Sequence, residues 1–257
     1  MPFSTIEVQA SGTRGSITLN RPEKLNPLST LTLAELAEAA HWLDRQSEIR
    51  VVVLSGRGRA FSAGADVASF AGGEPDAPTA RQAADAGRLM AEAIGEMRAV
   101  TIAAIHGHCV GGGVVLAAAC DLRLAAQSTR FSIPEVDLGI PLAWGGIPRL
   151  VREIGPAMTK ELVLSCRAFT AEEARGLGLI NRVLPDDELD RATGQLADEL
   201  ARKSPLTLTA TKLAVNAAAE ELASTAGAWS DADLLLSAFA DPESRRVGRE
   251  YIERLGR

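Results

Sequence analysis

Three segments of the chain combine residue types that can stabilise a negative charge and move a proton. A triple glycine at 111–113 precedes an apolar run at 114–119, a glycine-centred loop covers 60–66, and Glu135 lies in an otherwise apolar loop. Glycines at a helix start let a ligand contact backbone N–H groups, and the helix dipole favours negative charge there. The pKa of a carboxyl in apolar surroundings rises, which suits proton transfer near neutral pH. We therefore expect an oxyanion site beside one proton-transferring carboxyl.

Each of these signals also has a plain structural alternative. The glycines can serve tight turns, and Glu135 can cap a helix or form an ion pair with Arg130 or Arg149. Covalent catalysis is disfavoured because Ser62 and Cys109 have no visible partner residues that would activate them. Histidines at 106 and 108, with no third ligand nearby, make a poor metal site, so we expect no metal.

Buried strands are expected to position the two glycine loops. The short apolar runs 51–54 and 101–105 are typical of strands buried on both faces, and each is followed by one of the loops. If these strands are adjacent and parallel, both loops lie at the carboxyl edge of the sheet, where α/β proteins bind ligands. Further expected elements are a hairpin (6–9 and 16–19), helices (29–46 and 79–97), and strands (121–125 and 130–133). The chain is mostly helical beyond residue 134, so we predict an α/β protein with a mostly parallel sheet.

Bulk composition narrows the classes of function. The chain has 257 residues, 46% hydrophobic and 23% charged, which is ordinary for a globular protein. Its net charge of −6 argues against nucleic-acid binding. We expect Cys109, Cys120 and Cys166 to be buried, reduced thiols of a cytoplasmic protein. No basic-then-apolar signal pattern or uninterrupted membrane span is visible, so we expect no membrane association.

The ordered combination of segments is more specific than any one of them. Residues 19–29, 61–66, 105–113, 120–123, 134–139 and 145–155 together resemble the crotonase (enoyl-CoA hydratase/isomerase) superfamily. The resemblance implies a crotonase-like fold of repeated ββα turns, with a catalytic core over 1–200 and a C-terminal helical trimerisation region over 201–257. It also implies an acyl-CoA thioester as ligand and a homotrimer or homohexamer as assembly. Coenzyme A is part of the substrate, and no separate cofactor is expected.

The resemblance also implies roles for individual residues. The N–H groups of Ala65 and Gly112 would form the oxyanion hole for the thioester oxygen, and Glu135 would be the catalytic carboxyl. Residues that would bind the substrate fall into two groups. The coenzyme A path would be lined by Lys24, Leu25, Ala63, Asp66 and Val67, and the acyl group by Val115, Leu142 and Trp144.

One departure from the family pattern bears on the reaction. The hydratases of this superfamily carry a first glutamate two residues beyond the triple glycine, where this chain has Val115. A single base, Glu135, suffices to move a double bond from the 3 to the 2 position of an acyl thioester, so we favour an enoyl-CoA isomerase. Dienoyl-CoA isomerases carry aspartates where Val115 and Ala143 stand, which disfavours that chemistry. The alternatives are a hydratase in which Glu135 works with Asp137 or an ordered water, and a non-catalytic acyl-CoA-binding protein.

Overall fold

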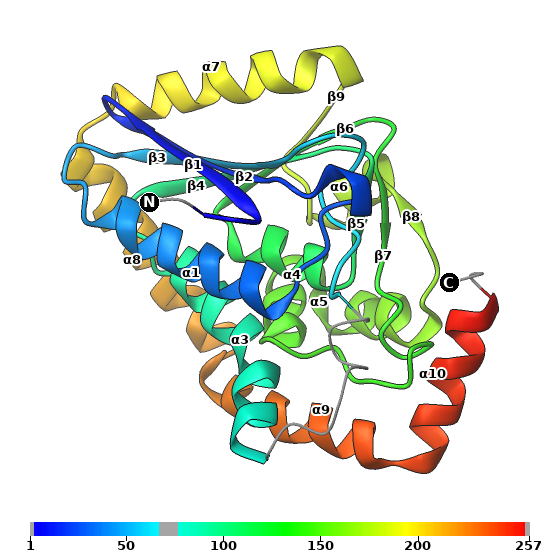
Figure 1. Cartoon of the computed structure of the whole chain (residues 1–257). Coiled ribbons are helices and arrows are strands. Elements are labelled where there is room, and N and C mark those ends of the chain that lie inside the picture. Colours follow the sequence, from blue (N-terminus) through cyan, green and yellow to red (C-terminus); the bar gives the residue numbers. More distant parts are fainter. Residues whose placement is uncertain (1–2, 67–76, 255–257) are drawn as a thin grey trace.

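The fold is built on two β-sheets with helices packed around them (Figure 1). The computed structural model describes residues 3–66 and 77–254. The larger sheet has the strand order β1-β2-β3-β4-β6-β9, and the smaller sheet has the order β5-β7-β8. Within the larger sheet β1 and β2 pair antiparallel, and every other neighbouring pair is parallel. This arrangement confirms the predicted α/β class with a mostly parallel sheet.

The predicted hairpin and inner strands lie where the hydrophobic pattern puts them. The strands of the larger sheet are β1 (Ile6–Ser11), β2 (Arg14–Leu19), β3 (Val51–Gly56), β4 (Val100–Ile105), β6 (Leu122–Ala126) and β9 (Arg182–Leu184). Those of the smaller sheet are β5 (His108–Val110), β7 (Arg130–Ser132) and β8 (Phe169–Thr170). β7 falls in the predicted strand 130–133, whereas β5, β8 and β9 are not predicted, because two or three residues are usually too few to display a hydrophobic period.

The helices follow the cap signals in the sequence. They are α1 (Thr30–Asp44), α3 (Ala77–Gly95), α4 (Gly112–Ala119), α5 (Gly146–Ser165), α6 (Ala171–Leu177), α7 (Leu189–Ala201), α8 (Pro205–Leu222), α9 (Asp231–Ala240) and α10 (Pro242–Arg254), with short 3-10 turns η1 (Pro22–Lys24), η2 (Asp186–Glu188) and η3 (Ala226–Ser230). Ser29 caps α1 by accepting a hydrogen bond from the Thr32 N–H. Thr170 caps α6 in the same way, from the Glu173 N–H, as its capping box predicts.

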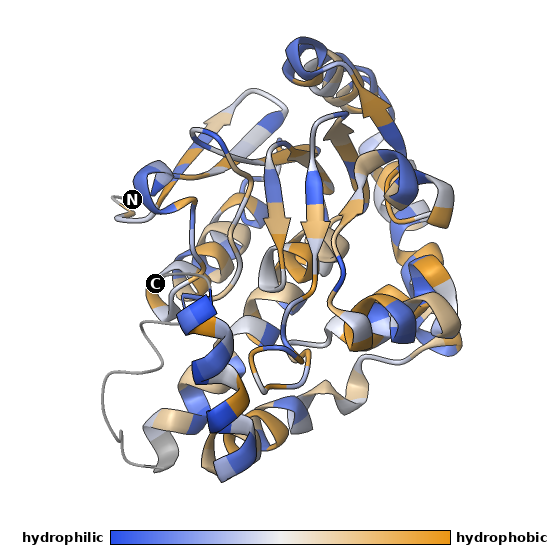
Figure 2. Ribbon diagram, turned by 90° about the vertical axis from the view of Figure 1, so that its right-hand side faces the viewer, coloured by the Kyte–Doolittle hydropathy of each residue, from blue (hydrophilic) through white to orange (hydrophobic). Residues whose placement is uncertain are grey.

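Helices cover both faces of the larger sheet, which is why its inner strands β3 and β4 are largely apolar. One face packs against α7, with Ile102 and Leu124 among its contacts, and the other packs against α1, α3, α4 and α5. Hydrophobic residues accordingly gather on the inner strands and on the helix faces turned toward them (Figure 2). Burial on both faces is the expected environment for a continuous Val/Ile/Leu strand.

Two successive units carry the strand–strand–helix pattern that the resemblance predicts. In the first unit β4 belongs to the larger sheet, β5 to the smaller sheet, and α4 follows. In the second unit β6 and β7 divide between the two sheets in the same way, and α5 follows. The short strands therefore turn the chain toward the segments that hold the candidate site.

The last part of the chain is helical and packs back onto the core. Helix α9 contacts α3 through Ala232, Leu235 and Ala84. Helix α10 approaches the loop after β7 so closely that a Cβ on Gly248 would lie 2.5 Å from the Leu138 carbonyl oxygen. No helix in the described part of the chain is long and apolar enough to cross a membrane. The division of the chain into a core and an assembly region stays a prediction.

Candidate active site

The two glycine loops meet at the carboxyl edge of β3 and β4, as predicted. These strands are adjacent and parallel. The loop after β3 pairs with β5 through a bridge between Ser62 and Cys109, and the Ser62 N–H donates to the His108 carbonyl at 3.0 Å. The Gly112 nitrogen lies 3.6 Å from the position that a Cβ on Gly64 would occupy. Ala65 and Gly112, the two candidate oxyanion donors, therefore lie on facing segments.

Both candidate donors have unused N–H groups. Among residues 3–66 and 77–254, neither the Ala65 nor the Gly112 amide donates to a protein acceptor. The neighbouring bonds explain this, because Leu28 pairs with the groups on either side of Ala65, accepting from the Asp66 N–H and donating to the Gly64 carbonyl. Gly112 is the first residue of α4, where N–H groups have no partner within the helix. Two such groups at one place are suited to hold an oxyanion.

Each residue of the triple glycine faces a different neighbour. A Cβ on Gly111 would lie 2.3 Å from Glu135 Oε1, and one on Gly112 would lie 2.3 Å from Cζ3 of Trp144. A Cβ on Gly113 would lie 3.0 Å from the Cβ of Ser62. The glycines are thus explained by close approach of a carboxyl, an indole and the first loop, rather than by a turn alone.

Glu135 is a buried carboxyl without an ion-pair partner among the described residues. It follows β7, and its side chain reaches the start of α4 at Gly111. The residue is 8% exposed, and Oε2 has no hydrogen-bond partner in the described part of the chain. Burial raises the pKa of Glu135 to about 7, while a hydrogen bond from its own backbone acts in the opposite direction. A carboxyl with this pKa can accept and return a proton near neutral pH.

The alternative reading of Glu135 as an ion-pair partner is wrong. Arg149 instead donates to the carbonyl oxygens of Trp144 and Gly145, at 3.3 and 3.0 Å. Arg130 donates to backbone carbonyls at 128 and 129. Burial raises the pKa of the Cys166 thiol, and Asp137, the second carboxyl of this loop, lies close to that thiol: a hydrogen bond from its backbone lowers the pKa, and its charge raises it.

Apolar side chains surround the position two residues beyond the triple glycine. Val115 is fully buried, and both it and Leu142 contact the backbone of Gly146. Trp144 is 6% exposed and has the left-handed backbone conformation, with φ of 64°. That conformation costs a bulky residue about 1–2 kcal/mol, so the surrounding contacts must hold it. Val115, Leu142 and Trp144, predicted to line the acyl group, are thus brought together near Gly112.

The predicted coenzyme A residues form a second group beside the first loop. Leu25 accepts a hydrogen bond from the Ala63 N–H at 2.8 Å, which joins the segment after η1 to this loop. Lys24 is exposed, and Asp66 forms an ion pair with Arg21 at 3.4 Å. Val67, also predicted here, lies outside the described residues. Four of the five predicted residues therefore occupy one region.

Two residues in this region have structural roles that the sequence did not indicate. Asn26 is buried in the left-handed conformation, and its side chain bonds the backbone at 21, 57 and 60. The Ser62 hydroxyl donates to the Asn26 carbonyl and accepts from the Gly64 N–H. The Leu-Asn-Pro sequence could have indicated a turn here, but two of the three backbone groups that Asn26 bonds are more than 30 residues away.

The remaining candidates have no catalytic arrangement. No group of three His, Cys, Asp or Glu residues that could hold a metal occurs in the described ranges. Cys109 and Cys120 are buried free thiols, as expected, whereas Cys166 is only half-buried, which corrects the expectation for that residue. Burial raises the pKa of Cys120 to about 12, so this thiol is not a nucleophile at neutral pH.

Comparison with known proteins is consistent along the whole chain. A family model described as enoyl-CoA hydratase/isomerase matches residues 10–256. A protein of Mycobacterium tuberculosis named a probable enoyl-CoA hydratase is 37% identical over 255 residues, covering 99% of this chain and 97% of that protein. A peroxisomal Delta(3,5)-Delta(2,4)-dienoyl-CoA isomerase of Arabidopsis thaliana is 35% identical, covering 82% of this chain and 81% of that protein. A crystal structure of an enoyl-CoA hydratase/isomerase from Mycobacterium paratuberculosis has a TM-score of 0.89 at 28% identity, covering 97% of this chain and 99% of that one.

Proposed function

The chain belongs to the enoyl-CoA hydratase/isomerase family, within the crotonase superfamily, and on that premise we propose that it converts a 3-enoyl-CoA to a 2-enoyl-CoA. Glu135 is the single proton shuttle of this reaction. The observation that carries the proposal is the isolation of this carboxyl: it is buried, its Oε2 has no partner among the described residues, and the position two beyond the triple glycine is Val115.

The proposed reaction needs one base and one oxyanion hole. Glu135 removes a proton from C2, the electron pair moves into the thioester, and the enolate oxygen accepts hydrogen bonds from the Ala65 and Gly112 N–H groups. The same carboxyl then returns the proton to C4 as the double bond forms between C2 and C3. A well-placed donor of this kind contributes about 3 kcal/mol to the transition state. The raised pKa of Glu135, to about 7, supports both halves of the proton transfer.

Hydration is the second candidate, and the names of the relatives favour it. The Mycobacterium tuberculosis relative and one of Clostridium acetobutylicum are named as enoyl-CoA hydratases. Adding water requires a group that activates the water and a proton source. In this chain the helper of Glu135 would be Asp137 or an ordered water. The apolar contacts of Val115 and Leu142 argue for isomerisation instead.

Paired substrates distinguish these candidates. The protein is mixed with 3-hexenoyl-CoA, and conjugation is followed by absorbance, while crotonyl-CoA hydration is measured in parallel. We expect isomerisation to exceed hydration, and Glu135→Gln to lower kcat by about 10²–10⁴-fold, as for loss of a general base. Asp137→Asn is the matched control and should keep the isomerase rate. Dominant hydration, together with loss of that activity in Asp137→Asn, would establish the hydratase.

A third outcome identifies a protein that binds acyl-CoA without turning it over. In that case a saturated acyl-CoA binds, yet neither enoyl-CoA is converted.

We propose that Lys24, Leu25, Ala63, Asp66 and Val67 line the coenzyme A path. We propose further that Val115, Leu142 and Trp144 line the acyl group, and that no cofactor besides the coenzyme A of the substrate is needed.

We also propose a homotrimer or homohexamer, built through the C-terminal helices. Large apolar side chains are exposed on α8 and the elements beside it in the sequence, which supports a covered surface there. They are Leu206, Leu213, Val215 and Leu222 on α8, Trp229 on η3 and Leu234 on α9. Light scattering during size-exclusion chromatography measures the assembly directly, and a monomer at micromolar concentration would contradict the proposal.

Buried free thiols at Cys109 and Cys120 support a cytoplasmic location.

A further inference from the structure

Trp144 fills the gap between α3 and α4, directly beside one of the candidate oxyanion donors. A Cβ on Gly87 of α3 would lie 2.0 Å from Cδ2 of the indole, and a Cβ on Gly112 would lie 2.3 Å from Cζ3. Since a Cα–Cβ bond is about 1.5 Å long, ring carbons lie within about 3.5 Å of the Gly87 Cα and about 3.8 Å of the Gly112 Cα. These separations are van der Waals contact, so no methylene chain passes between the ring and either helix.

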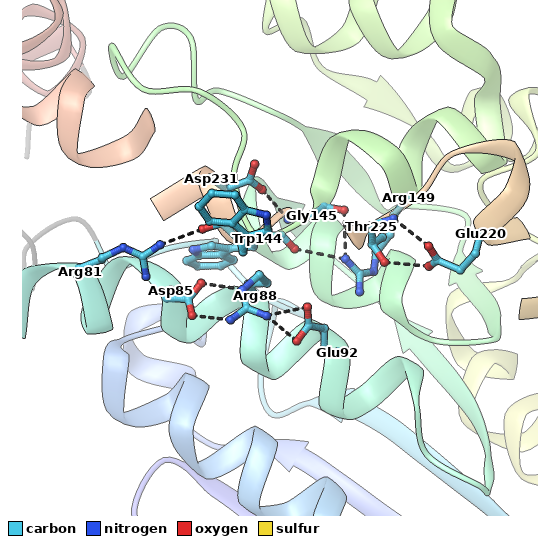
Figure 3. Close-up of polar contacts among 11 residues, drawn as sticks. Arg81, Asp85, Arg88, Glu92, Trp144, Gly145, Arg149, Glu220, Thr225 and Asp231 are labelled. Atoms are coloured by element: carbon cyan, nitrogen blue, oxygen red, sulfur yellow. Dashed lines mark hydrogen bonds and ion pairs between the residues drawn. The ribbon is translucent and has the colours of Figure 1, made fainter. Parts of the chain in front are cut away.

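Hydrogen bonds to the backbone of Trp144 and Gly145 hold the segment that carries the indole (Figure 3). The Gly145 N–H donates to Asp231 Oδ2 at 2.7 Å, which ties the segment to α9. The Arg149 guanidinium donates to the carbonyl oxygens of Trp144 and Gly145. Arg149 is itself buried, so this clamp is shielded from water. The left-handed backbone of Trp144 is therefore held by bonds to two charged groups, and the packing of the ring against Gly87 and Gly112 confines the side chain.

From this geometry we infer that Trp144 limits the acyl group to short chains. The inference rests on the proposed function, because it takes the thioester oxygen to be held at Gly112. An acyl chain that starts there meets the indole edge within its first few carbons. The indole edge and the proposed site of the thioester oxygen both lie against Gly112, so the two are close together.

Binding of saturated acyl-CoAs tests this inference without relying on the reaction. Dissociation constants for butanoyl-CoA, octanoyl-CoA and free coenzyme A are measured by calorimetry for the wild type, Trp144→Ala and Trp144→Leu. Each methylene newly buried tightens binding about fourfold. We expect the wild type to bind octanoyl-CoA within threefold of butanoyl-CoA, and both variants to prefer octanoyl-CoA by more than tenfold. Leu164→Ala, which removes an exposed apolar side chain on α5, is the control and should keep the wild-type ratio.

The possible outcomes separate the inference from the proposed function. A wild type that already prefers octanoyl-CoA by tenfold, or variants that keep the wild-type ratio, would overturn the role of Trp144 alone. Acyl-CoAs that bind no tighter than free coenzyme A would overturn the proposed function. A second measurement covers variants that fail to fold: Trp42→Phe with Trp229→Phe leaves Trp144 as the sole tryptophan, and saturation with butanoyl-CoA should change its emission. Unchanged emission at calorimetric saturation would also overturn the inference.

Discussion

Substituting Glu135 by glutamine should change the pH dependence of folding stability as well as the chemistry. Burial raises the pKa of this carboxyl from an ordinary value of 4.5 to about 7, and the residue is almost fully buried, so screening by water is slight. A difference of that size corresponds to about 3 kcal/mol. The folded protein holds the proton more tightly than the unfolded chain. The stability that Glu135 contributes is therefore fully present below pH 4.5 and is lost as the pH rises through 7.

Glutamine does not titrate, so this loss is absent in the variant. The free energy of unfolding of Glu135→Gln minus that of the wild type should therefore rise by about 3 kcal/mol between pH 4.5 and pH 8. Any cost of placing an amide in this site is the same at every pH and drops out of the comparison. Compared with the wild type, the variant should therefore become more stable over the pH range in which Glu135 of the wild type is ionised and can act as the proposed base.

Urea titrations at pH 5, 6, 7 and 8 measure this difference, at one protein concentration because assembly also contributes to stability. Glu48→Gln, at an exposed position, is the matched control and should show no comparable change with pH. A Glu135→Gln difference that stays constant across the series would refute the raised pKa. The assignment of Glu135 as a base near neutrality would then lose its physical support.

Three further predictions concern activity at the same site. The kcat/KM for 3-hexenoyl-CoA should fall tenfold per pH unit below about 7, because Glu135 must be ionised to accept the proton, and a rate independent of pH from 5 to 8 would contradict this. Gly111→Ala should lower kcat at least 100-fold, because the added methyl group pushes the Glu135 carboxyl aside. Gly176→Ala, whose methyl group would meet no atom within 4 Å, should keep the wild-type kcat in the same absorbance assay. Val115→Glu should raise crotonyl-CoA hydration relative to isomerisation and lower the free energy of unfolding by about 2–5 kcal/mol, since it buries a carboxyl against Leu142 and Gly146. If hydration is unchanged in a folded Val115→Glu protein, the absence of a second carboxyl is not what limits hydration in this chain.

The sequence predicts the loops of the site better than it predicts their partners. Strands β3 and β4 are apolar because both faces are covered, so their ends, and the two glycine loops, could be located from the pattern alone. The residues that contact these glycines could not be located from the pattern. Gly111 is one residue from Gly112, yet one faces Glu135 and the other Trp144, and the choice depends on how the loop after β7 folds back.

The surroundings of Trp144 were beyond the reach of sequence reasoning for the same reason. Gly87 is an unremarked glycine within α3, where it costs helix stability, and only the indole packed against it explains its presence. Asp231 bonds Gly145 across 86 positions of sequence. A left-handed tryptophan is rare enough that no local rule predicts it.

The contact of α10 with the loop after β7 gives the last helix an influence on the chemistry. Its Gly248 lies against Leu138, and a Cβ on Gly139 would lie 2.1 Å from the Ser244 carbonyl oxygen, so helix and loop touch backbone to backbone only a few residues from Glu135. We therefore expect limited proteolysis between α9 and α10 to loosen the loop that carries Glu135, the proposed base, while leaving the sheets intact. For the same reason, affinity tags and fusion partners are better attached at the N-terminus, which lies beside β1 at the other side of the molecule (Figure 1).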